Sequence, residues 1–157
     1  MKTIHFSHKR YWLALFVVII PLFTGLTGCS TPVQSSSSQG LKMASMDQMP
    51  AAVQKAPVNV REAYQFGVAN PDALKNVPCY CGCGAVGHTS NYSCYVKETR
   101  PSGEIVFDTH ALGCGICVDI AQDVMKYTRQ GKSPQEIRAA IDQTFGQYGP
   151  TNMAPVK

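Results

Sequence analysis

The stretch Pro78-Cys79-Tyr80-Cys81-Gly82-Cys83-Gly84 sets three cysteines at alternate positions on a backbone loosened by two glycines. Three thiolates on a chain that can curl around one centre are typical of sites for Cu(I), Zn(II) or iron–sulfur clusters. Further cysteines and two histidines follow by residue 117. The sequence therefore predicts a metal site, and its candidate ligands are Cys79, Cys81, Cys83, Cys94, Cys114, Cys117, His88 and His110.

The second dense motif is Cys114-Gly115-Ile116-Cys117, which we expect in the first turn of a helix over residues 114–130. Unsatisfied backbone N–H groups and the helix dipole at that position favour thiolate over thiol. A C-x-x-C pair alone is typical of zinc sites and of thiol–disulfide exchange centres alike. Together with the alternating cysteines and the two histidines, it favours metal binding.

Two alternatives to metal binding stay open. In a thiol–disulfide redox protein, Cys114 and Cys117 would be the exchange pair. In a disulfide-stapled structural module, six cysteines would form three bridges, although cysteines two residues apart cannot bridge each other. No Ser/His/Asp order, phosphate loop or pair of carboxylates stands out, so the sequence does not predict an enzyme.

Residues 1–28 have the pattern of a lipoprotein signal peptide. Lys2, Lys9 and Arg10 precede an apolar run, and Leu26-Thr27-Gly28 leads into Cys29. A basic start, a short apolar run and small residues before the cleavage point are typical of secretion, and a cysteine at that point predicts lipid attachment. We expect an extracytoplasmic protein anchored to a bacterial membrane by diacylglyceryl and palmitate chains on Cys29.

Most of the positive charge lies in this predicted signal. The chain has 14 Lys and Arg against 10 Asp and Glu, a formal charge of +4. Removing residues 1–28 leaves eleven basic and ten acidic side chains, a charge of +1. No basic patch with interleaved aromatic residues remains, so we expect no nucleic-acid partner. The expected partners are the membrane, the metal ion and a metal-exchanging protein.

Residues 29–57 are rich in Ser, Gln, Ala, Met and Pro and predict a flexible tether. Met43, Met46 and Met49 follow one another at a spacing of three. Thioethers bind Cu(I) in oxidising surroundings, so this segment is a candidate auxiliary copper-binding arm. The methionine arm favours copper, and so does the ability of Cu(I) to bind only two or three thiolates. Zinc is the second choice. The expected role is scavenging, storage or delivery of the ion.

Residues 58–157 predict one small, mainly α-helical domain with a single β-hairpin, in which the cysteine-rich loop packs near the start of the longest helix. Proline, capping and turn residues mark the element boundaries. The expected elements are a helix from Asn59, a helix from Asn70-Pro71, strands over 93–98 and 104–107, a helix over 114–130 and a helix from Ser133-Pro134.

These residues resemble the bacterial PCYCGC-motif lipoprotein family over residues 58–154. The likeness rests on Asn70 to Lys75, Pro78 to Gly84, Gly87-His88, Phe107 to His110 and Gly113 to Cys117. The resemblance implies a metal-binding role. Residues 119–148, with two expected helices around Gly131-Lys132-Ser133, are more weakly similar to the helical module of cytochrome c maturation thiol-reductase subunits.

Overall fold

The computed structural model describes residues 40–153. The predicted signal peptide (1–28), the predicted lipidation site Cys29 and the first part of the predicted tether lie outside these residues. None of the helices within the described range is long and apolar enough to cross a membrane.

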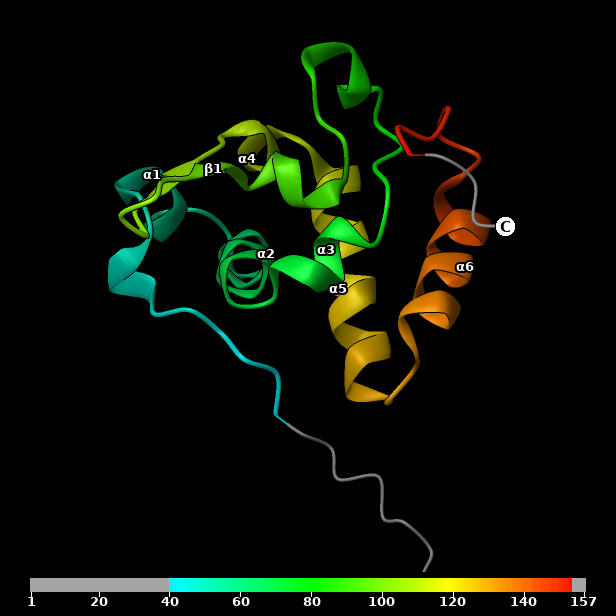
Figure 1. The fold of residues 1–157 in the computed structure, drawn as a ribbon, viewed down its shortest axis with the longest axis horizontal. Coiled ribbons are helices and arrows are strands. Elements are labelled where there is room, and N and C mark those ends of the chain that lie inside the picture. The colour runs from blue at the N-terminus through cyan, green and yellow to red at the C-terminus, as the bar shows by residue number, and fades with distance from the viewer. Residues whose placement is uncertain (1–39, 154–157) are drawn as a thin grey trace, which may run out of the picture. The chain divides into compact units, whose positions relative to one another are not determined.

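The described domain is mainly α-helical with one two-stranded antiparallel sheet, as the sequence predicts (Figure 1). The longest helix, α5, packs against both α2 and α6 and so forms the middle of the domain. In chain order the elements are η1 (Met46–Gln48), α1 (Ala51–Gln54), α2 (Val58–Ala69), α3 (Pro71–Lys75), η2 (Cys83–Val86), η3 (Asn91–Cys94), β1 (Val96–Thr99), β2 (Ile105–Phe107), α4 (His110–Gly113), α5 (Gly115–Arg129) and α6 (Pro134–Phe145).

The helices bury the apolar faces that their sequence periodicity predicts. On α2 the buried side chains include Tyr64 and Phe66, and on α5 they include Ile120 and Val124. Helix α6 begins with the predicted capping box: the Ser133 amide donates to Glu136 Oε2 at 2.8 Å, and the Glu136 amide donates to Ser133 Oγ at 3.3 Å. This reciprocal pair satisfies amides that have no partner within the helix.

The first strand is shorter than the sequence predicts. It begins at Val96, because Asn91–Cys94 form the 3₁₀ turn η3 in place of the expected extended chain from residue 93. Val96 pairs with Phe107 and Thr99 with Ile105, with an irregularity between Val96 and Glu98. The turn carries Cys94 into the interior, where its side chain is fully buried.

The ordered domain starts well before residue 58, which corrects the predicted extent of the tether. The amide of Ala44 donates to the Gln65 carbonyl at 3.0 Å, and Gln65 Nε2 donates back to the Ala44 carbonyl at 2.7 Å. Met49 is 3% exposed and belongs to the core, and Met46 is half-buried against it. Residues three positions apart lie on one side of a 3₁₀ turn, so the side chains of Met46 and Met49 both face the domain.

Only Met43 of the three methionines is exposed, so the free methionine arm that we expected is not formed. Figure 1 also places α1, which follows these methionines, away from the cysteine-rich loop.

Substituting Met49 and Met43 separately tests whether residues 43–49 pack on the domain. Met49→Ala should lower the free energy of unfolding by about 2–5 kcal/mol, because it leaves a cavity in the core. Met43→Ala is the matched control, and its change should stay within about 0.5 kcal/mol. Urea unfolding of both variants in the same reducing buffer measures the difference. Equal losses for the two would show that the segment does not pack on the domain.

Candidate metal centre

Three segments far apart in the sequence bring six free thiols together. The loop that follows α3 carries three of them, η3 ends with one, and the start of α5 carries the C-x-x-C pair, with Cys114 as its N-cap. This confirms that the pair occupies the first turn of the longest helix, with the cysteine-rich loop packed beside it. Four thiols are at most 3% exposed and belong to the hydrophobic core: Cys79, Cys83, Cys94 and Cys117. The other two, Cys81 and Cys114, are partly exposed.

The sulfur of Cys117 lies at the middle of this cluster. It is 3.2 Å from the sulfur of Cys79, 3.2 Å from that of Cys94 and 3.6 Å from that of Cys81. Two further contacts close the group, at 3.3 Å between Cys79 and Cys81 and at 3.9 Å between Cys83 and Cys94. Five of the six thiols, all but that of Cys114, are therefore joined by these contacts into one cluster.

The donor atoms fall into three overlapping groups of four, each with all its atoms within 4.8 Å of one another. All three contain Cys117, and Cys81, Cys83 and His110 each belong to two. The groups are Cys79, Cys81, Cys83 and Cys117; Cys81, His110, Cys114 and Cys117; and Cys83, Cys94, His110 and Cys117. All six cysteines and one of the two histidines that the sequence singles out are thus brought together.

The second histidine lies beside the cluster and is oriented by a carboxylate. His88 Nδ1 is 3.5 Å from Cys94 Sγ, and His88 Nε2 is 3.5 Å from Asp108 Oδ2. The same carboxylate accepts the His110 backbone amide through Oδ1 at 2.8 Å, and His110 Nε2 lies 3.5 Å from Cys81 Sγ. A carboxylate on the outer nitrogen of an imidazole is typical of metal sites, where it orients the ligating nitrogen. Asp108 was missed as a site residue, although it stands two positions before His110.

Two buried side chains donate hydrogen bonds to the backbone carbonyl of Cys117. Tyr95 Oη donates to the Cys117 carbonyl at 2.7 Å, and Asn91 Nδ2 donates to the same oxygen at 3.1 Å. Both side chains are fully buried, and Asn91 Oδ1 is the one buried side-chain oxygen or nitrogen in residues 40–153 that has no hydrogen-bond partner. These contacts fix the start of α5, and with it the shared sulfur. No local motif in the sequence marks either residue.

Asn152 clamps the cysteine-rich loop at both ends. Its Oδ1 accepts the Cys79 amide at 2.9 Å, and its Nδ2 donates to the His88 carbonyl at 2.9 Å (the loop and the C-terminal segment adjoin in Figure 1). A Cβ at Gly84 would come within 3.2 Å of Asn152 Cβ, so glycine permits this approach. Gly82 and Gly87, on either side of η2, have φ values of 81° and 92°, which other residues rarely adopt.

Tyr80 fastens the same loop to α6. Its hydroxyl donates to Asp142 Oδ1 at 2.7 Å, and Arg138 Nε donates to the same carboxylate at 2.8 Å. Burial, with the hydrogen bond to the carboxylate, raises the pKa of Tyr80 to about 12. Tyr80 is therefore a packing residue that joins the loop to α6.

The thiols do not ionise independently of one another. The pKa of Cys79 is lowered, because the thiols of Cys117 and Cys94 donate hydrogen bonds to its sulfur. The pKa of Cys117 is raised for the complementary reason, since it donates to Cys79. The hydrogen bonds of Cys117 to Cys79 and Cys94 thus oppose the thiolate that we expected at Cys117 from the helix dipole. Burial likewise raises the pKa of Cys83.

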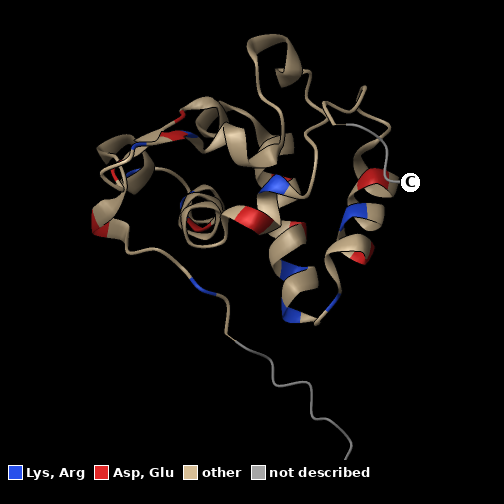
Figure 2. Ribbon diagram, viewed as in Figure 1, with Lys and Arg blue, Asp and Glu red and all other residues tan. Residues whose placement is uncertain are grey.

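The segments that build the centre carry almost no charge. Residues 76–96 and 109–118 contain no Asp, Glu, Lys or Arg, and the cysteine-rich loop is free of charged residues in Figure 2. Several thiolates cannot be buried together without a compensating positive charge. These segments supply no ammonium or guanidinium group, so a bound cation is a species that could compensate several thiolates there.

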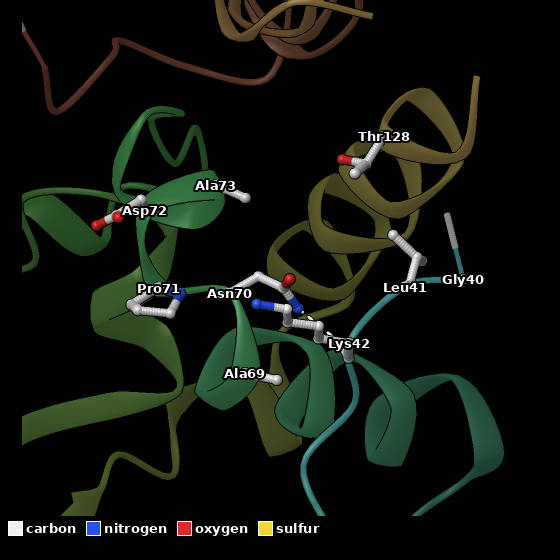
Figure 3. Close-up of a pocket in the computed structure, with 9 residues that line it drawn as sticks. All are labelled: Gly40, Leu41, Lys42, Ala69, Asn70, Pro71, Asp72, Ala73 and Thr128. Atoms are coloured by element: carbon white, nitrogen blue, oxygen red, sulfur yellow. Dashed lines mark hydrogen bonds between the residues drawn. The ribbon is translucent and has the colours of Figure 1, made fainter. Parts of the chain in front are cut away.

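A separate pocket lies elsewhere in the domain. It has a volume of about 350 Å³ and lies between the segment 40–42, residues 69–73 and Thr128 of α5 (Figure 3). Asn70 Nδ2 donates to the Lys42 carbonyl at 2.8 Å at its edge. No cysteine or histidine lines it, so it is no part of the candidate metal centre.

Comparison with known proteins returns one family. A family model described as "Protein of unknown function with PCYCGC motif" matches residues 23–156. No curated protein and no solved structure matches the chain. The similarity of residues 119–148 to cytochrome c maturation subunits receives no support from these comparisons.

Removing the Asn152 clamp should loosen the cysteine-rich loop. In Asn152→Ala the buried Cys79 amide loses its acceptor, so we expect a destabilisation of about 1–3 kcal/mol and faster hydrogen exchange at that amide. Gln147→Ala is the control, since this exposed side chain bonds only within its own turn. Amide exchange followed by NMR on reduced protein measures the effect. An unchanged exchange rate at Cys79 in Asn152→Ala would contradict the clamp.

Proposed function

The chain belongs to the family of proteins of unknown function with a PCYCGC motif, and we propose its function from the chemistry of its own site. We propose that it binds soft metal ions in a polynuclear centre made by its six clustered cysteines and His110. The observation that carries this proposal is the sharing of Cys117 by three overlapping donor groups. Thiolates bridge metal ions readily, so shared sulfurs suit a cluster of several ions.

Copper(I) is the ion that this arrangement favours. Structural zinc takes four ligands in a closed tetrahedron, so two separate zinc ions would need eight donors with none in common. Here the seven grouped donors overlap, and His88 lies outside the groups. Cu(I) is soft and accepts two or three thiolates, so the same sulfurs would serve several ions. Zinc remains the second choice.

We further propose that the centre acts outside the cytoplasm, on a protein anchored to a bacterial membrane through lipid on Cys29. The support is the signal-like pattern of residues 1–28 and the cysteine at its end. In that setting the protein would scavenge, store or deliver copper, and its partner would be a protein that exchanges the ion.

The geometry gives no preference to a separate redox pair. Cys117 lies 3.2 Å from two thiols outside the C-x-x-C motif, and all six cysteines of the described residues are free. Thiol–disulfide exchange at Cys114 and Cys117 and a disulfide-stapled module are therefore the alternatives that the next experiment must separate from metal binding.

Thiol counting on anaerobically purified protein tests the proposed function. Elemental analysis should find copper, and the six thiols should resist alkylation until a Cu(I) chelator removes the ions. Removal should also lower the thermal midpoint of unfolding, because ligation and folding free energies are coupled.

The alternatives give different results in the same experiment. An exchange protein would show one pair, Cys114 and Cys117, that follows a glutathione redox buffer while four thiols stay unchanged. A disulfide-stapled module would show six oxidised cysteines and no response to chelation. Recovery of three disulfides from freshly isolated protein would contradict the metal proposal.

Replacement of Cys29 tests the proposed anchor independently of the metal. Cys29→Ser should abolish labelling by a radioactive or clickable fatty acid, because the sulfur is the acyl acceptor. The variant should also accumulate with residues 1–28 still attached. Ser30→Ala is the neighbouring control and should be lipidated and cleaved like the wild type. Labelled and correctly cleaved Cys29→Ser protein would rule out the lipoprotein assignment.

A further inference from the structure

We propose that the centre is divided into a buried part that retains ions and a half-exposed exchange subsite through which they pass. The exchange subsite is the group formed by Cys81, His110, Cys114 and Cys117. This inference rests on the proposed function and adds to it the route by which an ion enters and leaves. It is carried by the burial of the donors and by the way the groups overlap.

Burial separates the three donor groups. In the exchange subsite three of the four residues are partly exposed, and only Cys117 is buried. Each of the other two groups has three buried residues and a single partly exposed one. Cys114 belongs to the exchange subsite alone, and Cys79 belongs to the inner group of three cysteines from the loop plus Cys117. An ion arriving from solvent therefore meets Cys114, Cys81 and His110 before it can reach Cys79.

Shared donors connect the subsite to the interior. Cys117 belongs to every group, Cys81 joins the subsite to the Cys79 group, and His110 joins it to the Cys83 and Cys94 group. An ion held at the subsite can thus gain an inner ligand while it keeps Cys117. No step requires a free ion in the core, where an unpaired charge would be strongly disfavoured.

The surface around the subsite suits a small thiol complex as the carrier. Gly113 and Gly115, on either side of Cys114, are exposed and carry no side chain, and residues 109–118 contain no charged side chain. The sulfur of Cys114 is therefore approached over an uncovered and uncharged backbone.

The transfer step needs no oxidant or reductant. A Cu(I) ion bound to small-molecule thiolates gains a bond to Cys114 Sγ and loses one to a carrier thiolate. The proton released by the Cys114 thiol passes to the departing thiolate, and copper stays Cu(I) throughout. Repetition at Cys81 and Cys117 completes the transfer by thiolate exchange alone.

Two matched cysteine substitutions test the division. Cu(I) presented as its glutathione complex is mixed anaerobically with metal-free, reduced full-length protein, and thiolate-to-copper charge-transfer absorbance follows its uptake. Cys114→Ser should slow uptake by about tenfold while the final copper content falls by no more than one ion. Cys79→Ser should slow initial uptake less than Cys114→Ser does, but the copper that survives dialysis against a Cu(I) chelator should fall more. Cys114 and Cys79 each belong to one donor group only. The two variants therefore disrupt the same number of donor groups and differ in whether the lost thiol is partly exposed or buried.

The variants are chosen to keep the fold. Cys114 is the N-cap of α5, where serine is among the preferred residues, so Cys114→Ser should retain the helix start. His110→Gln provides a second change in the subsite and should also slow uptake. Far-UV circular dichroism of each variant checks that the helices persist.

The outcomes distinguish a failure of the exchange subsite from a failure of the proposed metal binding. Wild-type protein that takes up no Cu(I) would overturn both. If the wild type takes up Cu(I) normally, two results would contradict the exchange subsite and leave the proposed metal binding intact. One is equal slowing of Cys114→Ser and Cys79→Ser, and the other is a wild-type rate for Cys114→Ser.

Discussion

The convergence of sulfur atoms on Cys117 is the constraint on which the rest of the site depends. Its sulfur lies within 3.6 Å of three other thiols from two separate segments. Its carbonyl oxygen accepts hydrogen bonds from Tyr95 and Asn91 of the η3 segment, which also carries Cys94, so both the side chain and the backbone of Cys117 are held. A shift of the first turn of α5 would change all three donor groups at once. The helix start is therefore as important to the centre as the cysteines themselves.

Fold and site are not separable in this domain. Four of the six thiols belong to the hydrophobic core, so the centre takes the place that aliphatic side chains occupy in other small domains. Free thiols pack as small apolar side chains, and only Cys79 among the buried ones has a lowered pKa. A bound ion would replace these contacts with ligand bonds that the unfolded chain lacks, and the loop, η3 and α5 would then be joined covalently through sulfur and metal.

Signals that act within a few residues predict much of the fold. The Ser133–Glu136 capping box marks α6, Pro71 marks α3, and the cysteine spacing identifies six thiols that the structure brings together. The missed features depend on distant partners. Asn152 reaches back to Cys79 across 73 residues, and Met49 is buried in a core that residues from the whole domain build. Composition alone made residues 41–57 resemble a linker, since their few apolar side chains become a packed face only against the rest of the domain.

The charge balance of the buried, nearly uncharged cluster supports our proposal of a monovalent soft ion. A Cu(I) ion held by two thiolates displaces two protons and adds one positive charge, so the cluster becomes more negative by one unit. A zinc ion held by four thiolates displaces four protons and adds two positive charges, so the cluster becomes more negative by two units. Residues 76–96 and 109–118 provide no Lys or Arg side chain to compensate that change, and burial makes an uncompensated charge costly. The proposed Cu(I) ions would therefore bury less uncompensated negative charge per ion than zinc, among sulfurs that are already in contact.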